Sequence, residues 1–165
     1  MALDATVGGA TSNSYCDQAW ADAYHVNRTF NPEWAALTVA QKESVLIFAQ
    51  RILSQQLYLG YRVTYTQSLR WPRNNLFDRD GWFISYLVVP DFIKDAQAEL
   101  ALYLIREDRT LDQGSTAIDK VTVGTISIDF SPSRYTKALP DAVFDMIGFT
   151  LQGGGSSVFT KVVRT

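Results

Sequence analysis

The segment 38–57 constrains the fold most, because it carries both a start signal and a one-sided apolar pattern for an α-helix. Thr38 and Gln41 have the spacing of a capping box, in which the hydroxyl and the amide each satisfy a backbone donor of the first turn. Apolar residues then recur at three- and four-residue steps from Val45 to Leu53, which predicts one buried face. That face must pack against a second element.

A second helix, predicted over 90–107, supplies the partner. Pro90 suits a helix start because it has no N–H to leave unpaired, and Asp91 suits the positive end of the helix dipole. Its apolar stripe runs from Phe92 to Leu104. We expect the two helices to pack as an antiparallel pair and to form the core.

Shorter elements complete a mainly α (α+β) fold: a small bundle of about four helices, a β-hairpin and extended arms at both ends. Further helices are predicted over 18–27, after Asp17, and over 140–152, after Pro140. A β-branched run over 118–130, broken at Gly124, is typical of a hairpin.

We expect an N-terminal arm over 1–14, a helical domain over 15–152 with a long loop at 58–90, and a C-terminal arm over 153–165 that is hinged at three glycines.

Composition limits the possible partners. The 165 residues are 47% hydrophobic and 19% charged, which is typical of one globular domain with a real core. A net charge of -2 provides no general attraction to nucleic acid or anionic membranes. Cys16 is the only cysteine, so no intrachain disulfide can form. With no signal peptide pattern and no run of roughly 20 apolar residues, we expect a soluble protein with no membrane partner, made in a cytoplasm.

No catalytic set can be assembled from the sequence. His25 is the only histidine, and we expect it to be half-exposed on the first helix without a nucleophile beside it. Asp78 and Asp80 resemble part of a calcium loop, but the other spaced ligands and the closing Glu are missing, which favours a turn held by Arg79. We predict no enzymatic activity, no metal site and no cofactor.

The segment 62–82, with Tyr61 beside it, has the most unusual chemistry, because arginines alternate with aromatic residues. These residues are Tyr61, Arg62, Tyr65, Arg70, Trp71, Arg73, Phe77, Arg79 and Trp82. They could track phosphates and stack bases of a single strand. Alternatively, the aromatics anchor the core or an interface while the arginines pair with Asp78, Asp80 and carboxylates of a neighbour. The acidic chain favours the second interpretation, which predicts a subunit interface formed by Arg70, Trp71, Arg73, Asp78, Arg79 and Trp82.

Several short motifs, in order, carry a family resemblance. They are Asn-Ser-Tyr at 13–15, Ala-Asp-Ala-Tyr at 21–24, Trp34 before Gln-Lys-Glu at 41–43, Ser-Leu-Arg-Trp-Pro-Arg at 68–73, Asp-Arg-Asp-Gly at 78–81 and Glu-Leu-Ala-Leu at 99–102. The chain resembles a family of tailed-phage and prophage proteins labelled DnaT-like single-stranded-DNA-binding proteins, whose better-understood relatives are head-tail connector or adaptor (head completion) proteins. It departs from the family pattern at 87–90 and at 54–65.

The resemblance implies a virion protein at the head-tail junction. It implies a homo-oligomeric ring, commonly of twelve subunits, that binds the portal protein and a tail or stopper protein while genomic double-stranded DNA passes through without sequence-specific binding. We expect the C-terminal residues Val158, Phe159, Val162, Val163 and Arg164 to dock to the portal. The rival hypothesis is a single-stranded-DNA-binding protein, in which Trp71 and Trp82 stack bases and Arg62, Arg70 and Arg73 hold phosphates.

Overall fold

A computed structural model describes residues 2–28, 32–108, 120–123, 126–129 and 139–153. The helices are α1 (Gln18–Val26), α2 (Pro32–Ala35), α3 (Val39–Ser54), α4 (Asp91–Arg106) and α5 (Asp141–Ile147), and the short 3-10 helix η1 (Gly148–Thr150) follows α5. Two antiparallel pairs of strands are present, β1 (Tyr61–Arg62) with β2 (Arg73–Asn74) and β3 (Lys120–Val123) with β4 (Ile126–Asp129). The fold is mainly α with some β, as the sequence predicts.

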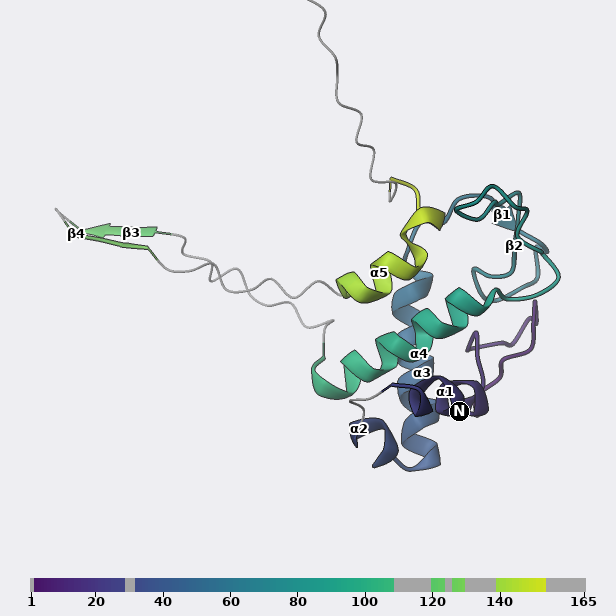
Figure 1. The fold of residues 1–165 in the computed structure, drawn as a ribbon, viewed down its shortest axis with the longest axis horizontal. Helices are drawn as coiled ribbons and strands as arrows, with labels where there is room; N and C mark the ends of the chain where they lie inside the picture. The colour runs from purple at the N-terminus through teal and green to yellow at the C-terminus, as the bar shows by residue number, and fades with distance from the viewer. Residues whose placement is uncertain (1, 29–31, 109–119, 124–125, 130–138, 154–165) are drawn as a thin grey trace, which may run out of the picture.

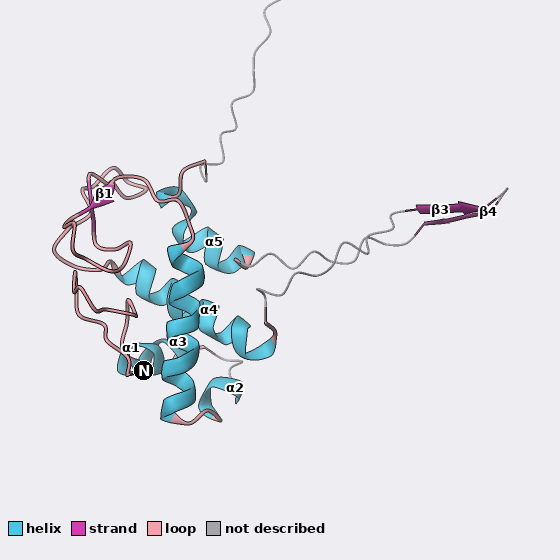
Figure 2. Cartoon of the chain, turned by 180° about the vertical axis from the view of Figure 1, so that it is seen from behind, coloured by secondary structure: helices cyan, strands magenta, loops and turns pink. Residues whose placement is uncertain are grey.

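Helices α3 and α4 form the centre of the molecule. They cross obliquely. Helix α5 packs on one side of the point where they cross, and α1 and α2 pack on the opposite side (Figures 1 and 2). The predicted capping box is present: the Thr38 hydroxyl accepts from the Gln41 N–H at 3.4 Å, and Gln41 Oε1 accepts from the Thr38 N–H at 2.9 Å. Helix α3 ends at Ser54, three residues before the predicted end, and the buried Tyr58 hydroxyl caps it by donating to the Leu53 carbonyl at 3.0 Å.

The buried face of α3 is rotated from the predicted one. Leu46 and Gln50 are buried, whereas Val45 and Phe48, predicted for the core, are only partly covered. Helical spacing alone allows either stripe, because apolar residues occupy positions 45–49 almost without interruption. The partner helix α4 selects the stripe that is buried.

A buried amide joins the N-terminal segment to both central helices. Gln97, on α4, is fully buried, and its Oε1 accepts from the Tyr15 N–H at 2.8 Å and the Cys16 N–H at 3.2 Å. Its Nε2 donates to the Ser14 hydroxyl at 2.7 Å and to the Leu46 carbonyl at 2.8 Å. All four hydrogen-bonding positions of the amide are therefore used, which is the condition for burying such a group at little cost.

The segment 2–14 folds back on its own chain. Asp4 accepts through its carbonyl from the N–H groups of Asn13 and Ser14 and through its carboxylate from Thr11. The Ser68 hydroxyl and N–H both donate to the Gly9 carbonyl at 3.1 Å, which ties this segment to the loop 58–90. The predicted arm therefore takes its order from contacts within the subunit.

The two strands of the predicted hairpin are present and pair in antiparallel orientation. Lys120 pairs with Asp129, and Val123 pairs with Ile126. The reversal between them, at 124–125, lies outside the described residues. The predicted helix over 140–152 is interrupted at Gly148, where α5 gives way to the tighter turn of η1.

Candidate interaction surface

The irregular loop 58–90 is held in one shape by a buried arginine. Arg73 is 7% exposed, and its guanidinium donates to the carbonyls of Leu59 at 2.7 Å, Gly60 at 2.7 Å, Arg70 at 3.2 Å and Tyr58 at 3.3 Å. A guanidinium has five N–H donors in a rigid plane, so one side chain can gather several carbonyls. Arg73 thus supports the loop from inside the subunit.

Two other side chains fix the same loop from inside. Trp71 is 1% exposed and makes edge-to-face contacts with Tyr58 and Phe92 at centroid distances of 5.6 and 5.8 Å. Gln67 is also buried, and its amide nitrogen donates to the carbonyls of Leu69 and Pro72 at 2.9 and 3.1 Å. The loop is irregular in secondary structure, yet the Arg73 guanidinium and the Gln67 amide bond several of its backbone carbonyls from inside.

Gly60 is required at the start of the loop. Its φ is +66°, and a Cβ at this position would lie 2.3 Å from the Asn74 carbonyl. Only glycine combines this backbone angle with so close an approach of β2. The C-terminal end of the described chain adds a further tie, because the Leu59 N–H donates to the Thr150 carbonyl at 2.8 Å.

The outer side of this loop is unusually apolar. Large exposed apolar side chains are Leu57, just before the loop, and Leu59, Tyr61, Tyr65, Phe77, Trp82, Phe83, Tyr86, Leu87 and Val88 along it. The rings of Phe77, Phe83 and Tyr86 form one exposed cluster, with successive centroids 6.0 and 6.3 Å apart. We call these three residues the aromatic cluster. A rigid loop with exposed aromatic side chains is the composition of a binding surface.

The turn before the aromatic cluster is organised by Asp78. Its carboxylate accepts from the Asp80 N–H at 3.0 Å and the Trp82 N–H at 2.8 Å. Arg79, which was predicted to hold this turn, instead donates to the Asp145 carbonyl and lies over the Phe149 ring, with 5.1 Å from guanidinium carbon to centroid. Hydrogen bonds within the turn therefore fix its conformation, and Arg79 links the turn to α5 and η1.

The predicted interface residues divide into two groups. Trp71 and Arg73 are buried within the subunit, so neither presents its side chain to a partner. Arg70, Arg79 and Trp82 are exposed, and Asp78 is half-buried. Arg70 donates to the Ser54 carbonyl at 3.2 Å. The predicted portal-docking residues, Val158, Phe159, Val162, Val163 and Arg164, lie outside the described residues.

Sequence reasoning missed Phe83, Tyr86, Leu87 and Val88 as surface residues. The sequence does contain a pattern that could have pointed to these residues. From Trp82 to Val88, six of the seven residues are apolar, without helical spacing, just before the helix that starts at Pro90. Such a run is as compatible with a buried strand as with an exposed loop. Only the packing beneath it distinguishes the two.

His25 also differs from its prediction. It is 1% exposed, and its Nε2 donates to the Ala98 carbonyl at 3.1 Å, while its ring packs against Trp34 at a centroid distance of 4.4 Å. The pKa of His25 is lowered to about 4, mainly by burial and to a smaller extent by the charge of Arg28, while the bond to the Ala98 carbonyl opposes the change. The ring is a neutral core residue at pH 7.

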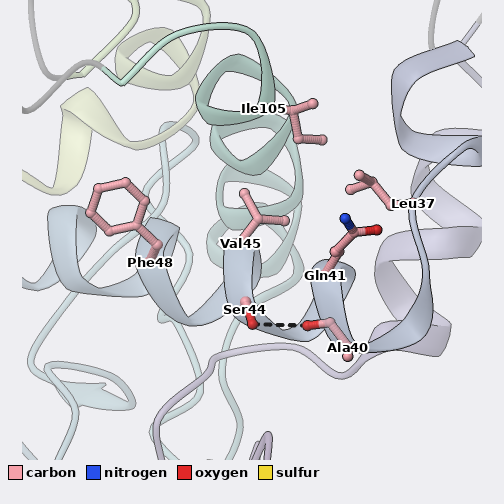
Figure 3. Close-up of a pocket in the computed structure, with 7 residues that line it drawn as sticks. All are labelled: Leu37, Ala40, Gln41, Ser44, Val45, Phe48 and Ile105. Carbon is pink, nitrogen blue, oxygen red and sulfur yellow. Dashed lines mark hydrogen bonds between the residues drawn. The ribbon is translucent and has the colours of Figure 1, made fainter.

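Two of the grooves in the described surface have a mainly apolar lining. One, of about 500 Å³, is lined by apolar side chains of α3 and α4 and the turn before α3, including Leu37, Val45, Phe48 and Ile105 (Figure 3). The other, of about 480 Å³, has an apolar floor of Phe92, Met146 and Phe149. The rest of its lining is charged and consists of Asp78, Asp80, Asp95 and Asp145 together with Arg79. We call this second groove the acid-rimmed groove.

Within the part of the chain that the structure describes, no group of three or more His, Cys, Asp or Glu side chains could hold a metal ion. None of the helices described is long and apolar enough to cross a membrane.

These features define a mainly α protein whose rigid, irregular loop presents exposed aromatic and aliphatic side chains. Comparison with protein families places it further: the chain belongs to the family described as "Putative DnaT-like ssDNA binding protein", whose model matches residues 1–165. No curated protein and no solved structure matches the chain.

Proposed function

We propose that this protein is a non-enzymatic structural component of a tailed-phage particle. Identical subunits form a ring between portal and tail, the adaptor or head completion position, and double-stranded DNA passes through its lumen. The protein is made in the cytoplasm of the host bacterium and ends in the virion, where a ring of about twelve copies contacts the portal and a tail or stopper protein.

The aromatic cluster is the observation that carries this proposal. Phe77, Phe83 and Tyr86 are exposed on a loop that Arg73 and Trp71 fix from inside. A preorganised apolar surface loses little conformational entropy when it is covered by a partner, and exposed apolar clusters of this kind mark protein interfaces. A ring needs such a surface to meet a different surface of the next subunit, because head-to-tail contacts close a cycle.

The aliphatic members of the surface favour a protein partner over a nucleic acid. Leu57, just before the same loop, and Leu87 and Val88 along it are exposed, and aliphatic side chains have no ring on which a base could stack. The carboxylates of Asp78 and Asp80 adjoin the aromatic cluster in sequence and oppose binding of phosphates.

The test is a double substitution in the aromatic cluster, Phe83→Ser with Tyr86→Ser. Tagged copies are expressed during growth of the phage that encodes the protein, and purified particles are assayed for incorporation. The wild type is expected at the head-tail junction in a fixed number of copies, and the double variant is expected to be missing while its circular dichroism and melting stay unchanged.

A matched control replaces Val26, an apolar residue of α1 that is 82% exposed, with serine, and should be incorporated like the wild type. Incorporation of a folded double variant at the wild-type level would refute the interface role. Absence of the wild-type protein from particles would refute the proposed function itself.

A second candidate function is single-stranded-DNA binding, and the family description favours it. Trp71 and Arg73 cannot contribute, because both are buried. Trp82, which is 75% exposed, remains available to stack a base, with Arg62 and Arg70 exposed on the same loop.

Trp82 makes this candidate easy to test. Trp34 and Trp71 are buried, and Trp20 is partly covered under Lys94, so a stacked base would quench mainly Trp82. DNA binding predicts salt-sensitive quenching of tryptophan fluorescence by a single-stranded oligonucleotide, which Trp82→Phe reduces. An unchanged spectrum at low salt would exclude this candidate.

A further inference from the structure

The acid-rimmed groove combines an apolar floor with a negative rim. Phe92, Met146 and Phe149 are each only partly buried against the core, so their outer surfaces form the floor. Four Asp residues and one Arg residue line the groove, so the formal side-chain charge of its lining is −3. A ligand that fits must offer apolar groups together with cations.

Two of these carboxylates keep their capacity for a new partner. Asp78 accepts from the backbone of its own turn, and Asp95 accepts from the Trp20 indole at 2.9 Å. Asp80 and Asp145 are exposed, and among the described contacts their carboxylates take part in no side-chain hydrogen bond. Arg79 covers part of the Phe149 ring without neutralising either carboxylate by a salt bridge within 4 Å among the described residues.

The C-terminal segment 154–165 has the complementary chemistry. It contains Val158, Phe159, Val162 and Val163 as apolar residues, Lys161 and Arg164 as cations, and no Asp or Glu. Its side-chain charge of +2 opposes the −3 of the groove.

Chain length allows the segment to reach the groove of its own subunit. Phe149 lines the groove and lies four residues before Gly153, so the two are at most about 14 Å apart. Six further residues lead to Phe159, and an extended chain of that length spans roughly 20 Å. Gly153, with φ of +77°, has a backbone angle that reverses the chain without strain.

We propose that residues 154–165 dock in the acid-rimmed groove of the same subunit, with Phe159 on the apolar floor and Lys161 and Arg164 at the rim beside Asp80 and Asp145. The tether raises the local concentration of the segment far above that of any other copy, which favours the intramolecular arrangement. The docking concerns the free subunit and holds whether or not a ring forms. Where the segment also binds a portal, the groove and the portal compete for it.

Disulfide trapping in the full-length chain tests this docking. Thr160→Cys places a thiol beside Phe159, and Ala142→Cys places one on α5, one helical turn before Met146 and exposed. The control pairs Thr160→Cys with Ala40→Cys, an exposed alanine at the other groove, whose lining is uncharged. Cys16 does not compete, because it is buried and burial raises the pKa of its thiol to about 12.

Docking predicts that the 142–160 disulfide forms at least about fivefold faster than the 40–160 disulfide, the ratio that roughly 1 kcal/mol of preference gives. Each rate is first divided by the rate at which the helix cysteine reacts with a small neutral disulfide, which corrects for the acidic neighbours of position 142. Adding Asp80→Asn and Asp145→Asn should reduce the ratio.

Equal corrected rates for the two pairs would overturn the proposal, as would a ratio that is insensitive to both Asp→Asn changes. A disulfide that forms mainly between two molecules, and faster at higher protein concentration, would also overturn it by identifying a second copy as the source of the segment.

Discussion

Arg73 shows how one side chain can replace regular secondary structure. The loop it supports has only two-residue strands, β1 and β2, yet four of its carbonyls meet at one guanidinium. Hydrogen bonds to a charged donor are stronger than those between neutral groups, and leaving the acceptors unpaired costs more than the bonds gain. This residue therefore serves the fold, although its position among aromatics suggests a phosphate ligand.

Arg73→Lys should lower the free energy of unfolding by about 2–3 kcal/mol, because an ammonium group cannot satisfy four spread carbonyls. Urea denaturation measures the change. Arg70→Lys is the control: Arg70 is exposed and makes one backbone bond, so we expect a change within about 0.5 kcal/mol. Equal effects at the two positions would contradict the structural role of Arg73.

His25 makes stability depend on pH. Its folded pKa of about 4 lies below the value of 6.5 for a free histidine, so the unfolded chain binds the proton more tightly. The stabilisation is fully present above pH 6.5 and is lost as the pH falls toward 4, by up to about 3 kcal/mol.

Urea midpoints between pH 7 and pH 4.5 measure this effect, and His25→Gln, which keeps an N–H donor without a titratable ring, should flatten the profile. A variant profile as steep as that of the wild type would assign the acid sensitivity to other groups.

At the scale of elements, α4 joins the other parts of the fold. It contacts α1, α2, α3 and α5, and its buried residues include the polar pair Gln97 and Glu99. Glu99 accepts from the Tyr24 hydroxyl at 3.0 Å and pairs with Arg28, so both polar side chains tie α4 to segments before α3. A helix that is buried on several sides needs such partners for each polar group it carries.

Gln97→Met keeps the length and flexibility of the side chain and removes its four hydrogen bonds. We expect a loss of about 3 kcal/mol, because two backbone N–H groups, a hydroxyl and a carbonyl then lose their partner inside the core. Gln41→Met at the exposed start of α3 should cost about 1 kcal/mol or less. Comparable losses for the two variants, measured by chemical denaturation, would contradict the central role of this amide.

At the scale of the whole molecule, the described N-terminal segment, the loop 58–90 and the helices share one core. Tyr15 and Cys16 belong to the same buried cluster as Trp71, Leu100 and Ile147, which come from distant parts of the sequence. Elements that share a core in this way unfold together in small domains.

The reactivity of the Cys16 thiol measures whether these elements unfold together. The thiol is buried, and burial, reinforced by the charges of Asp17 and Asp95, raises its pKa to about 12, so it should react with a thiol reagent only in the unfolded chain. The free energy of opening obtained from its labelling rate should equal that obtained by circular dichroism across a urea series. A much smaller opening energy would show that the segment around Cys16 detaches separately.

The sequence was most informative about helix starts, because those signals are local. Thr38 with Gln41, and Pro90 with Asp91, lie within the first turns that they initiate, and α3 and α4 begin there. The hairpin over 118–130 was predictable for the same reason, since β-branched residues flank a central glycine. The mainly α class, the positions of α1, α3 and α4, the start of α5 and the strands of this hairpin therefore followed from short-range chemistry, whereas α2 was not predicted.

Only the tertiary structure decided which side chains are buried. Trp71 and Trp82 lie in the same segment of alternating arginines and aromatic residues, yet Trp71 is in the core and Trp82 is exposed. Arg73 and Arg70 differ in the same way, and His25 is buried although we expected it to be half-exposed on the first helix. Burial depends on where distant segments meet, and a linear pattern of residues does not contain that information. The sequence therefore directed attention to the loop 58–90 as a candidate surface. Which of its residues are exposed depends on which ones pack against the core beneath the loop.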